Sequence, residues 1–354
     1  MPGSSVPDFN LRINGANAPN DLKRDITSVT VQEDLDALSV LTLELFNWKS
    51  AGSDMAQTWG DSSLLAVGNE IEISLGFVDN LHKVMLAEIT SLEAVFSTDD
   101  DQEDLLTVRC YDYRNRLARG RKTRNFSQMK DSAIVSQVAQ GAGLRAQVKD
   151  TKVTLPYVVQ SNQTDWEFLQ SRASRIGYEV YVKDKVLYFQ PPQNTGNAAT
   201  QIAVDEVGEF RPRLSARTQM GEVTVRGWDV KQKQVIVGKA AVGQEAGLMG
   251  GKASGARTAN RAFGKASAIC VNQPVQSKAE ADQMALGSFN TMALAYIEGT
   301  VAGGGRPQLH AGTVIEMTGA GKTFSGIYYV TSVTHTLTPE VGYQTEFTVK
   351  RNAA

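Results

Sequence analysis

The chain has 354 residues, of which 42% are hydrophobic and 21% charged, and its formal net charge at pH 7 is −2. This composition is typical of a soluble protein with two or three domains, and it argues against a general electrostatic attraction to nucleic acid or to an anionic membrane. The sequence has no apolar run of about 18 residues and no N-terminal signal sequence, so we expect no membrane-spanning segment and folding in a cytoplasm.

The N-terminal region, residues 7–115, has the alternating apolar pattern of antiparallel strands. In the stretch 40–45 the residues Leu41, Leu43 and Leu45 fall on one face, and residues 71–77 alternate in the same way. A half-buried strand has this period of two. We therefore predict a small antiparallel barrel or sandwich as the first domain, residues 1–115.

Two charged runs follow in this part of the chain. The acidic run between Asp99 and Asp104 lacks the glycine and the spacing of a calcium loop, so we interpret it as a solvated hairpin tip. The basic residues between Arg114 and Arg124 have no interleaved aromatic residues on which bases could stack. An inter-domain segment of salt bridges is therefore favoured over a nucleic-acid site, which salt-dependent DNA binding would support.

The middle of the chain is predicted to be α+β. Asp131 can cap a short helix that ends near Gly141. Thr164 and Glu167 have the spacing of a capping box for a second helix, which Gly177 closes. The inward face of that helix is expected to carry Trp166, Leu169, Ala173 and Ile176. A hairpin is expected to follow, with strands at residues 178–182 and 186–189.

A third helix and a long loop complete the middle region. Ser277 and Glu280 are predicted to form the capping box of the helix, with Ala281, Ala285, Phe289 and Met292 directed inward. Residues 236–266 are rich in glycine and alanine and have few apolar anchors, so we predict a long loop that a neighbouring subunit orders.

The sequence contains one triplet, Gly321-Lys322-Thr323, of the kind with which phosphate-binding loops end. Such a loop also needs a glycine at position 316, where the chain has Glu316, and it must open a helix, whereas the strand-forming residues 327–331 follow. The triplet is therefore interpreted as part of a hairpin turn, in which Gly319, Gly321 and Gly326 adopt positive φ.

No pattern of catalytic or ligand-binding residues is apparent. Cys110 and Cys270 are too few for a disulfide framework and are interpreted as small buried residues, and His82, His310 and His335 lack metal-ligand spacing. We therefore predict no catalytic, cofactor-binding or metal-binding residues, no cofactor, and a protein that is not an enzyme.

An internal repeat relates two distant parts of the chain. Residues 68–74 read GNEIEIS and residues 312–318 read GTVIEMT; residues 89–92 match 330–333, and residues 106–109 match 347–350. Thr90 and Thr107 are separated by the same 17 positions as Thr331 and Thr348. We predict one three-stranded antiparallel meander used twice, with the Gly-Lys-Thr turn in place of a Phe77–Lys83 loop.

These elements predict a β-rich α+β protein with two similar antiparallel β-barrel domains and an inserted α+β domain. The first barrel is residues 1–115, the middle domain is residues 116–205 and 236–293, and the second barrel is residues 206–235 and 294–354. Residues 222–228 are expected to be the early strand of the second barrel.

In this order and spacing, the motifs resemble the phage late control D proteins and the N-terminal hub part of VgrG-type spike proteins. The segments that carry the resemblance cover nearly the whole chain: 68–76 (GNEIEISLG), 87–92 (AEITSL), 108–112 (VRCYD), 131–143 (DSAIVSQVAQGAG), 162–177 (NQTDWEFLQSRASRIG), 225–231 (VRGWDVK), 304–312 (GGRPQLHAG), 328–335 (YYVTSVTH) and 342–350 (GYQTEFTVK).

The resemblance implies the baseplate hub of a contractile phage tail or phage-tail-like injection system. In that family three chains form a ring, each giving two similar barrels, so that the homotrimer adapts a sixfold inner tube to a threefold spike. The partners implied are a hexameric inner tube or tube-initiator protein, a trimeric spike protein, baseplate wedge proteins, and cargo DNA or toxin that passes through the lumen. The expected location is a virion tail or an injection-particle baseplate, assembled in the bacterial cytoplasm.

Two further expectations accompany the resemblance. Many such spike proteins continue into an oligonucleotide-binding-type barrel and a needle, so a chain that ends at Ala354 would work with a separate spike polypeptide. The alternative hypothesis is a tail-associated cell-wall hydrolase, which would need a carboxylate pair in a cleft, for instance around Asp165 and Glu167.

Overall fold

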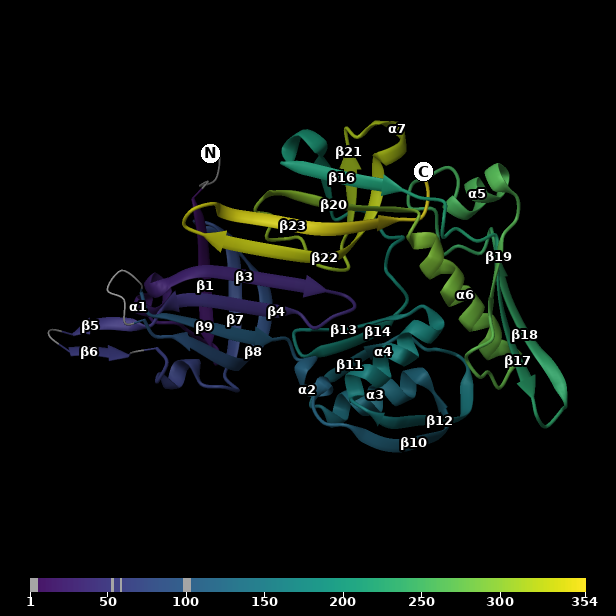
Figure 1. The fold of residues 1–354 in the computed structure, drawn as a ribbon, viewed down its shortest axis with the longest axis horizontal. Coiled ribbons are helices and arrows are strands. Elements are labelled where there is room, and N and C mark those ends of the chain that lie inside the picture. Colours follow the sequence, from purple (N-terminus) through teal and green to yellow (C-terminus); the bar gives the residue numbers. More distant parts are fainter. Residues whose placement is uncertain (1–5, 52–53, 58, 98–102) are drawn as a thin grey trace. The chain divides into compact units, whose positions relative to one another are not determined.

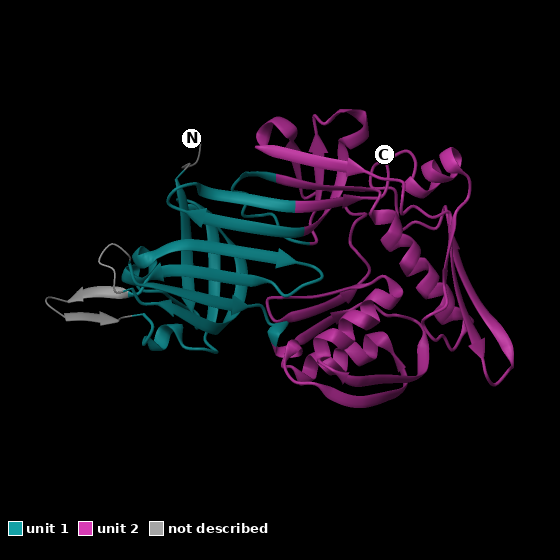
Figure 2. Cartoon of the chain, viewed as in Figure 1, with its two compact units in different colours: residues 1–115, 302–311, 332–347 teal, residues 116–301, 312–331, 348–354 magenta. Residues whose placement is uncertain are grey.

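A computed structural model describes residues 6–51, 54–57, 59–97 and 103–354. The chain divides into two compact units (Figure 2): unit 1 is residues 1–115, 302–311 and 332–347, and unit 2 is residues 116–301, 312–331 and 348–354. Three C-terminal strands have one part in unit 1 and the other part in unit 2. The three-domain boundaries predicted from the sequence stay a prediction.

Unit 1 is built from antiparallel strands (Figure 1). They follow the order β22-β3-β4-β9-β8-β7-β1-β2, and β5 and β6 form a separate hairpin. The elements of the N-terminal part are β1 (Pro7–Ile13), β2 (Ala16–Asn17), α1 (Asn20–Asp25), β3 (Ile26–Asp34), β4 (Val40–Phe46), β5 (Trp48–Ala51), β6 (Asp54–Gln57), η1 (Ser63–Leu65), β7 (Glu70–Phe77), β8 (Asn80–Val95) and β9 (Leu105–Tyr111).

The core of unit 1 follows from the period-two pattern of its strands. Leu41, Leu43 and Leu45 on β4 are buried, and so are Ile71 and Ile73 on β7, whereas the residues between them are partly or fully exposed. These side chains join one apolar cluster with those of β1, β3, β8 and β9. The predicted loop 77–83 is shorter than expected, because β8 already begins at Asn80.

Unit 2 contains an α+β part and a smaller sheet. Its elements up to β19 are α2 (Asn115–Ala118, of which Asn115 falls in unit 1), β10 (Lys122–Lys130), α3 (Asp131–Gly141), β11 (Arg145–Val148), β12 (Thr154–Gln163), α4 (Asp165–Ile176), β13 (Glu179–Lys183), β14 (Val186–Gln190), β15 (Thr200–Ala203), η2 (Val204–Glu206), β16 (Glu209–Leu214), β17 (Glu222–Asp229), β18 (Gln234–Ala241), α5 (Gly255–Phe263) and β19 (Ser267–Cys270).

The C-terminal elements complete both units. They are α6 (Lys278–Leu294), β20 (Ile297–Gly304), β21 (Val314–Thr318), α7 (Gly321–Phe324), β22 (Gly326–Thr338) and β23 (Gly342–Arg351), of which β20, β22 and β23 contribute residues to both units. Over the described residues, the strand orders do not return to their starting strands, so neither unit contains a closed barrel. The β-rich α+β prediction is confirmed, and the two-barrel arrangement stays a prediction.

The predicted helices of the middle region are present, with two corrections. On α6, the Ser277 hydroxyl accepts a hydrogen bond from the Glu280 N–H, but the Glu280 carboxylate accepts from the Gln276 N–H and pairs with Arg175, so the predicted capping box is only half formed. On α4, Thr164 and Glu167 form the capping box, and Gly177 ends the helix at φ 66°. Asp131, however, does not cap α3: it is the first residue of the helix, and its carboxylate accepts two hydrogen bonds from Arg172, at 2.6 and 2.9 Å. A partner 41 residues away therefore replaces the local capping interaction.

The glycine- and alanine-rich stretch 236–266 is not a long loop. It contains most of β18 and the whole of α5, which Ser254 caps through a hydrogen bond from the Arg257 N–H to its hydroxyl. A Cβ atom at Gly238 would lie 2.1 Å from the carbonyl carbon of Ala281, on the helix α6 that packs against β18 (Figure 1). The small residues therefore permit close packing of a helix on a sheet, a use of glycine that the sequence pattern does not distinguish from a turn.

The predicted early strand of the second barrel is also wrong. Residues 222–228 lie in β17, which pairs antiparallel with β18 and parallel with β19 in a separate three-stranded sheet. Its apolar residues Val223 and Val225 pack against α6 instead.

Candidate functional site

The carboxylates named for the hydrolase alternative are held in ion pairs at the start of α4. Asp165 is buried and accepts hydrogen bonds from Lys122 at 2.5 Å, Arg124 at 2.7 Å and Gln160 at 3.0 Å. Glu167 bonds the backbone N–H of Thr164 as part of the capping box and pairs with Arg121 at 2.9 Å. The two side chains therefore have structural partners, and nothing about their geometry marks an acid–base pair.

The same contacts account for much of the basic segment 114–124. Arg114 is buried, pairs with Asp112 at 2.6 Å and donates to the Ser39 hydroxyl and to the backbone oxygen of Asp34. Arg121, Lys122 and Arg124 pair with α4 as described above. The segment does form salt bridges, but these ion pairs lie within one unit or the other, so its predicted inter-domain role stays a prediction.

The remaining residues singled out in the sequence have separate positions. Cys110 is buried, and burial raises the pKa of its thiol; Cys270 is only partly buried. Most of the acidic run 99–104, namely residues 99–102, lies outside the described residues. Among the residues that the structure describes, no three His, Cys, Asp or Glu side chains are grouped as metal ligands, and no helix is long and apolar enough to span a membrane.

The Gly-Lys-Thr triplet lies between two antiparallel strands, as predicted. Its residues form α7, a single turn of helix between β21 and β22, and Gly319, Gly321 and Gly326 have φ values of 78°, 74° and 137°. A helix of one turn followed by a strand differs from the long helix that a phosphate-binding loop opens. The triplet is therefore part of the β21–β22 hairpin connection.

His335 is the one histidine that is fully buried. Its ring bonds the backbone oxygen of Leu309 at 3.1 Å and the hydroxyl of Tyr343 at 2.9 Å, all within unit 1. Burial lowers the pKa of His335 to about 4, against a smaller opposing effect of the Glu33 carboxylate. The ring is therefore neutral at pH 7 and lies among the buried residues of unit 1.

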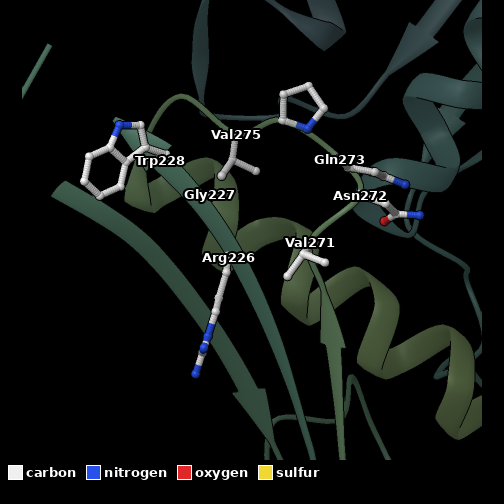
Figure 3. A pocket seen from close by; sticks show the side chains of 8 residues that line it. Arg226, Gly227, Trp228, Val271, Asn272, Gln273 and Val275 are labelled. Atoms are coloured by element: carbon white, nitrogen blue, oxygen red, sulfur yellow. The ribbon is translucent and has the colours of Figure 1, made fainter. Parts of the chain in front are cut away.

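A shallow groove of about 520 Å³ opens beside β17 in unit 2 (Figure 3). The exposed side chains of Trp228 and Val271 lie along it, together with Asn272 and Gln273. Among the described residues that line the groove, Arg226 is the only charged one, and they include no pair of groups suited to acid–base or nucleophilic chemistry.

The two predicted meanders are the most informative feature of the molecule. Strands β7, β8 and β9 are consecutive neighbours, and so are β21, β22 and β23. Ile71 pairs with Ala87 in the first meander, and Ile315 pairs with Tyr328 in the second. These residues occupy matching positions of the sequence repeat, so the two hairpins have the same register, and the predicted duplication is confirmed for this pair of strands.

The hydrogen bonds just before the first strand of each meander are duplicated as well. Gly68 N–H donates to the Ile89 oxygen and Gly312 N–H to the Val330 oxygen, both at 2.8 Å. Ile89 N–H and Val330 N–H donate in return to residues 69 and 313, both at 2.9 Å. Gly68 and Gly312 have φ values of 95° and 86°, a conformation that glycine adopts without strain.

The likeness extends beyond the meanders to the neighbouring strands. The first copy has the order β3-β4-β9-β8-β7-β1, and the second has β16-β20-β23-β22-β21-β15. The sequence pattern does not reveal β15 and β16 as strands of the second copy. They are four and six residues long, too short for a clear periodicity, and β15 pairs with β21 in parallel, whereas β1 pairs with β7 antiparallel.

Comparison with known families decides the membership of the chain. Residues 4–339 match the family described as the Alg8 N-terminal domain. The chain belongs to the Alg8 N-terminal domain family. The finer resemblance to late control D and VgrG-type proteins stays a prediction. Among curated proteins, no sequence matches the chain.

Solved structures share the fold of this Alg8 N-terminal domain protein. The 43 kDa tail protein of prophage MuSo2 from Shewanella oneidensis has a TM-score of 0.70 at 14% identity, with 98% of each chain covered. A tail protein from Neisseria meningitidis has a TM-score of 0.68 at 12% identity, with 98% of this chain and 97% of that chain covered.

A third similar structure comes from a secretion system. It is a component of the Escherichia coli type VI secretion system, described as structurally similar to the bacteriophage T4 tail proteins gp27 and gp5. Its TM-score is 0.58 at 14% identity, with 97% of this chain and 77% of that chain covered. At these identities the likeness establishes a shared fold, and the Alg8 N-terminal domain protein therefore has the fold of tail proteins.

Proposed function

We propose that this protein is the central hub of a contractile tail or injection-particle baseplate. Three copies form a ring, and each contributes its two related sheets, so the ring presents six near-equivalent positions. One face binds the hexameric inner tube or a tube-initiator protein, and the other binds a trimeric spike. Wedge proteins surround the ring, and DNA or toxin passes through its centre.

One observation carries this proposal: the same strand order and hairpin register occur twice in one chain. A trimer of identical single sheets would present only three equivalent positions to a sixfold tube. Duplication within the chain supplies the other three without a second gene product. The similar tail proteins and the type VI component, which have the same fold, support the placement in a contractile machine.

In this proposal each sheet becomes part of a barrel-like module within the ring, and the protein works through shape and symmetry rather than catalysis. The contacts of Asp165 with three polar partners support this, because they hold the carboxylate in a structural ion-pair network at the start of α4. The hydrolase alternative therefore has no observation in its favour.

Imaging of the intact particle tests the proposal. A small folded tag inserted in the exposed turn at residues 231–233, between β17 and β18, marks the protein without touching either related sheet. We expect three tags around the junction of tube and spike. A different copy number, or tags placed elsewhere on the particle, would contradict the proposal, and an untagged particle of normal length is the control.

A further inference from the structure

In the second copy, one edge of β22 has two successive partners. Residues 326–329 pair with β21, and residues 332–337 pair antiparallel with β3, from Ser332 opposite Asp34 to Leu337 opposite Val29. The second pairing lies within unit 1, where Leu337 packs against the apolar core. The C-terminal half of β22 is therefore covered by a strand that does not belong to its own copy.

In the first copy, the equivalent half of β8 lacks this partner. Thr90 and Thr331 are matching residues, so the six residues after Thr90 match the six after Thr331. Residues 80–88 of β8 pair with β7, and residues 91–95 pair with β9 on one side. Within the described parts of the chain, no strand lies along the other side of residues 91–95. We call residues 91–96 the β8 tail.

The side chains of the β8 tail have the exposure of an uncovered interface. Phe96 is 56% exposed and Val95 is 46% exposed, and Leu105, opposite Val95 on β9, is 37% exposed. Phe96 matches Leu337, which the pairing with β3 places against the unit 1 core. An aromatic side chain at a matching position is therefore left in solvent where its counterpart is packed.

The strand that could cover the β8 tail is β16. It corresponds to β3, because each lies two strands away from the last strand of its meander: β3-β4-β9 in the first copy and β16-β20-β23 in the second. Over the described residues, β16 has β20 as its only neighbouring strand. One edge of β16 is thus open, as one edge of the β8 tail is.

The two open edges have complementary side chains. On the outward face, the β8 tail has Glu93, which is 69% exposed and lies 3.8 Å from Arg109, and β16 has Arg213 beside the Arg211–Glu209 ion pair. On the other face, Phe96 of the tail and Leu214 of β16 are both exposed apolar residues. Pro212 removes one backbone donor from β16, as is common in strands that must avoid indiscriminate edge pairing.

We propose that β16 of one protomer pairs antiparallel with the β8 tail of a second copy of this chain, as β3 pairs with β22 within one chain. The contact joins two different surfaces, so repeating it three times closes a ring. This inference rests on the proposed function, because it assumes that the ring is trimeric. It assigns the strands that hold the ring together.

Cysteine cross-linking tests the contact. In a Cys270→Ser background, Glu93→Cys is combined in turn with a cysteine at each outward position of β16: Glu209→Cys, Arg211→Cys and Arg213→Cys. A disulfide requires Cα atoms within about 7 Å, so only a pair in register forms one under mild oxidation. We expect at least one pair to link most of the protein into a trimer that a thiol reductant dissolves.

Three controls test whether the cross-link is specific to the two strands, whether it joins two chains, and whether Phe96 contributes to the contact. Glu93→Cys combined with Lys231→Cys, in the exposed β17–β18 turn, is expected not to form the covalent trimer. Mixing the single variants Glu93→Cys and Arg213→Cys distinguishes a link between chains, which gives a dimer, from a link within one chain. Phe96→Ser is expected to weaken trimer formation at least tenfold while the unfolding temperature of the protomer stays unchanged.

The outcomes separate this inference from the proposed function. A protein that is trimeric in its particle but is not linked by any of the three pairs would overturn the strand pairing and leave the hub proposal standing. A protein that is monomeric in its particle would overturn both.

Discussion

The two copies of the sheet share the register of their central hairpin but differ in the segments that connect their strands. In the first copy, β7 and β8 are joined by two residues, and β4 follows β3 after a short turn. In the second copy, α7 lies between β21 and β22, and the segment 215–296, with its own sheet and helices, separates β16 from β20. The hairpin register is nevertheless the same. Register depends on the local strand pattern, and insertions at strand ends leave that pattern intact.

The flanking strands show where the constancy ends. β1 runs antiparallel to β7, but β15 runs parallel to β21. β15 follows the hairpin β13–β14, so its direction is set by where the chain leaves the middle region. The meander is therefore the part that both copies share, whereas the direction of the strand beside it differs between them. The predictions that follow test this equivalence from the largest expected effect to the smallest.

Truncation of the buried central side chain of either meander should lower the free energy of unfolding by a similar amount. Ile73 and Met317 occupy matching positions and are fully buried. Ile73→Ala and Met317→Ala should each lower the free energy of unfolding by about 2–5 kcal/mol, through lost burial and a residual cavity. Hydrogen exchange of β7 and of β21, measured by mass spectrometry, reports each site separately. The exposed Val67→Ala is the control, and a loss confined to one copy would break the equivalence.

His335 should make one copy sensitive to acid and not the other. Its pKa is lowered to about 4 by burial, whereas in the unfolded chain it is about 6.5, so the stabilisation is complete above pH 6.5 and is lost as the pH falls towards 4. The loss should reach roughly 3 kcal/mol. The matching residue of the first copy is Ala94, which does not titrate. Hydrogen exchange in β22 measured against pH checks this, and His335→Gln should flatten the profile.

The matching glycines that precede the two meanders should be equally intolerant of a side chain. Gly68 and Gly312 both have positive φ, so Gly68→Ala and Gly312→Ala should each cost about 1–2 kcal/mol of unfolding free energy. Gly196→Ala is the matched control, because its backbone is not in that region and nothing lies near its Cβ position. Chemical denaturation measures all three, and a neutral Gly312→Ala would show that the second turn tolerates alanine.

The smallest effect concerns one hydroxyl in each copy. Thr90 donates to the Arg109 backbone oxygen at 3.0 Å, while the matching Thr331 bonds the Thr348 hydroxyl at 2.8 Å. Thr90→Val and Thr331→Val should each cost about 0.5–1.5 kcal/mol. A double-mutant cycle of Thr331→Val with Thr348→Val should show coupling, and additive costs would mean that the two hydroxyls do not interact.

The sequence by itself determined the features that depend on local pattern. The capping box of α4 and its C-terminal Gly177 follow from side chain–backbone bonds within a few residues. The alternation of β4 and β7, and the equal 17-residue spacing of Thr90–Thr107 and Thr331–Thr348, likewise need only the period of a strand. The turn interpretation of Gly-Lys-Thr rests on the same local chemistry.

The tertiary structure alone decided the features that depend on distant partners. Asp131 bonds Arg172 rather than capping its helix, and Asp165 gathers Lys122 and Arg124, because ion pairs form between residues that folding brings together. Glycines such as Gly238 permit close packing instead of turns, which a sequence pattern cannot distinguish. The second copy of the sheet was completed by the short strands β15 and β16 rather than by residues 222–228, since membership of a sheet is fixed by long-range pairing and not by strand propensity.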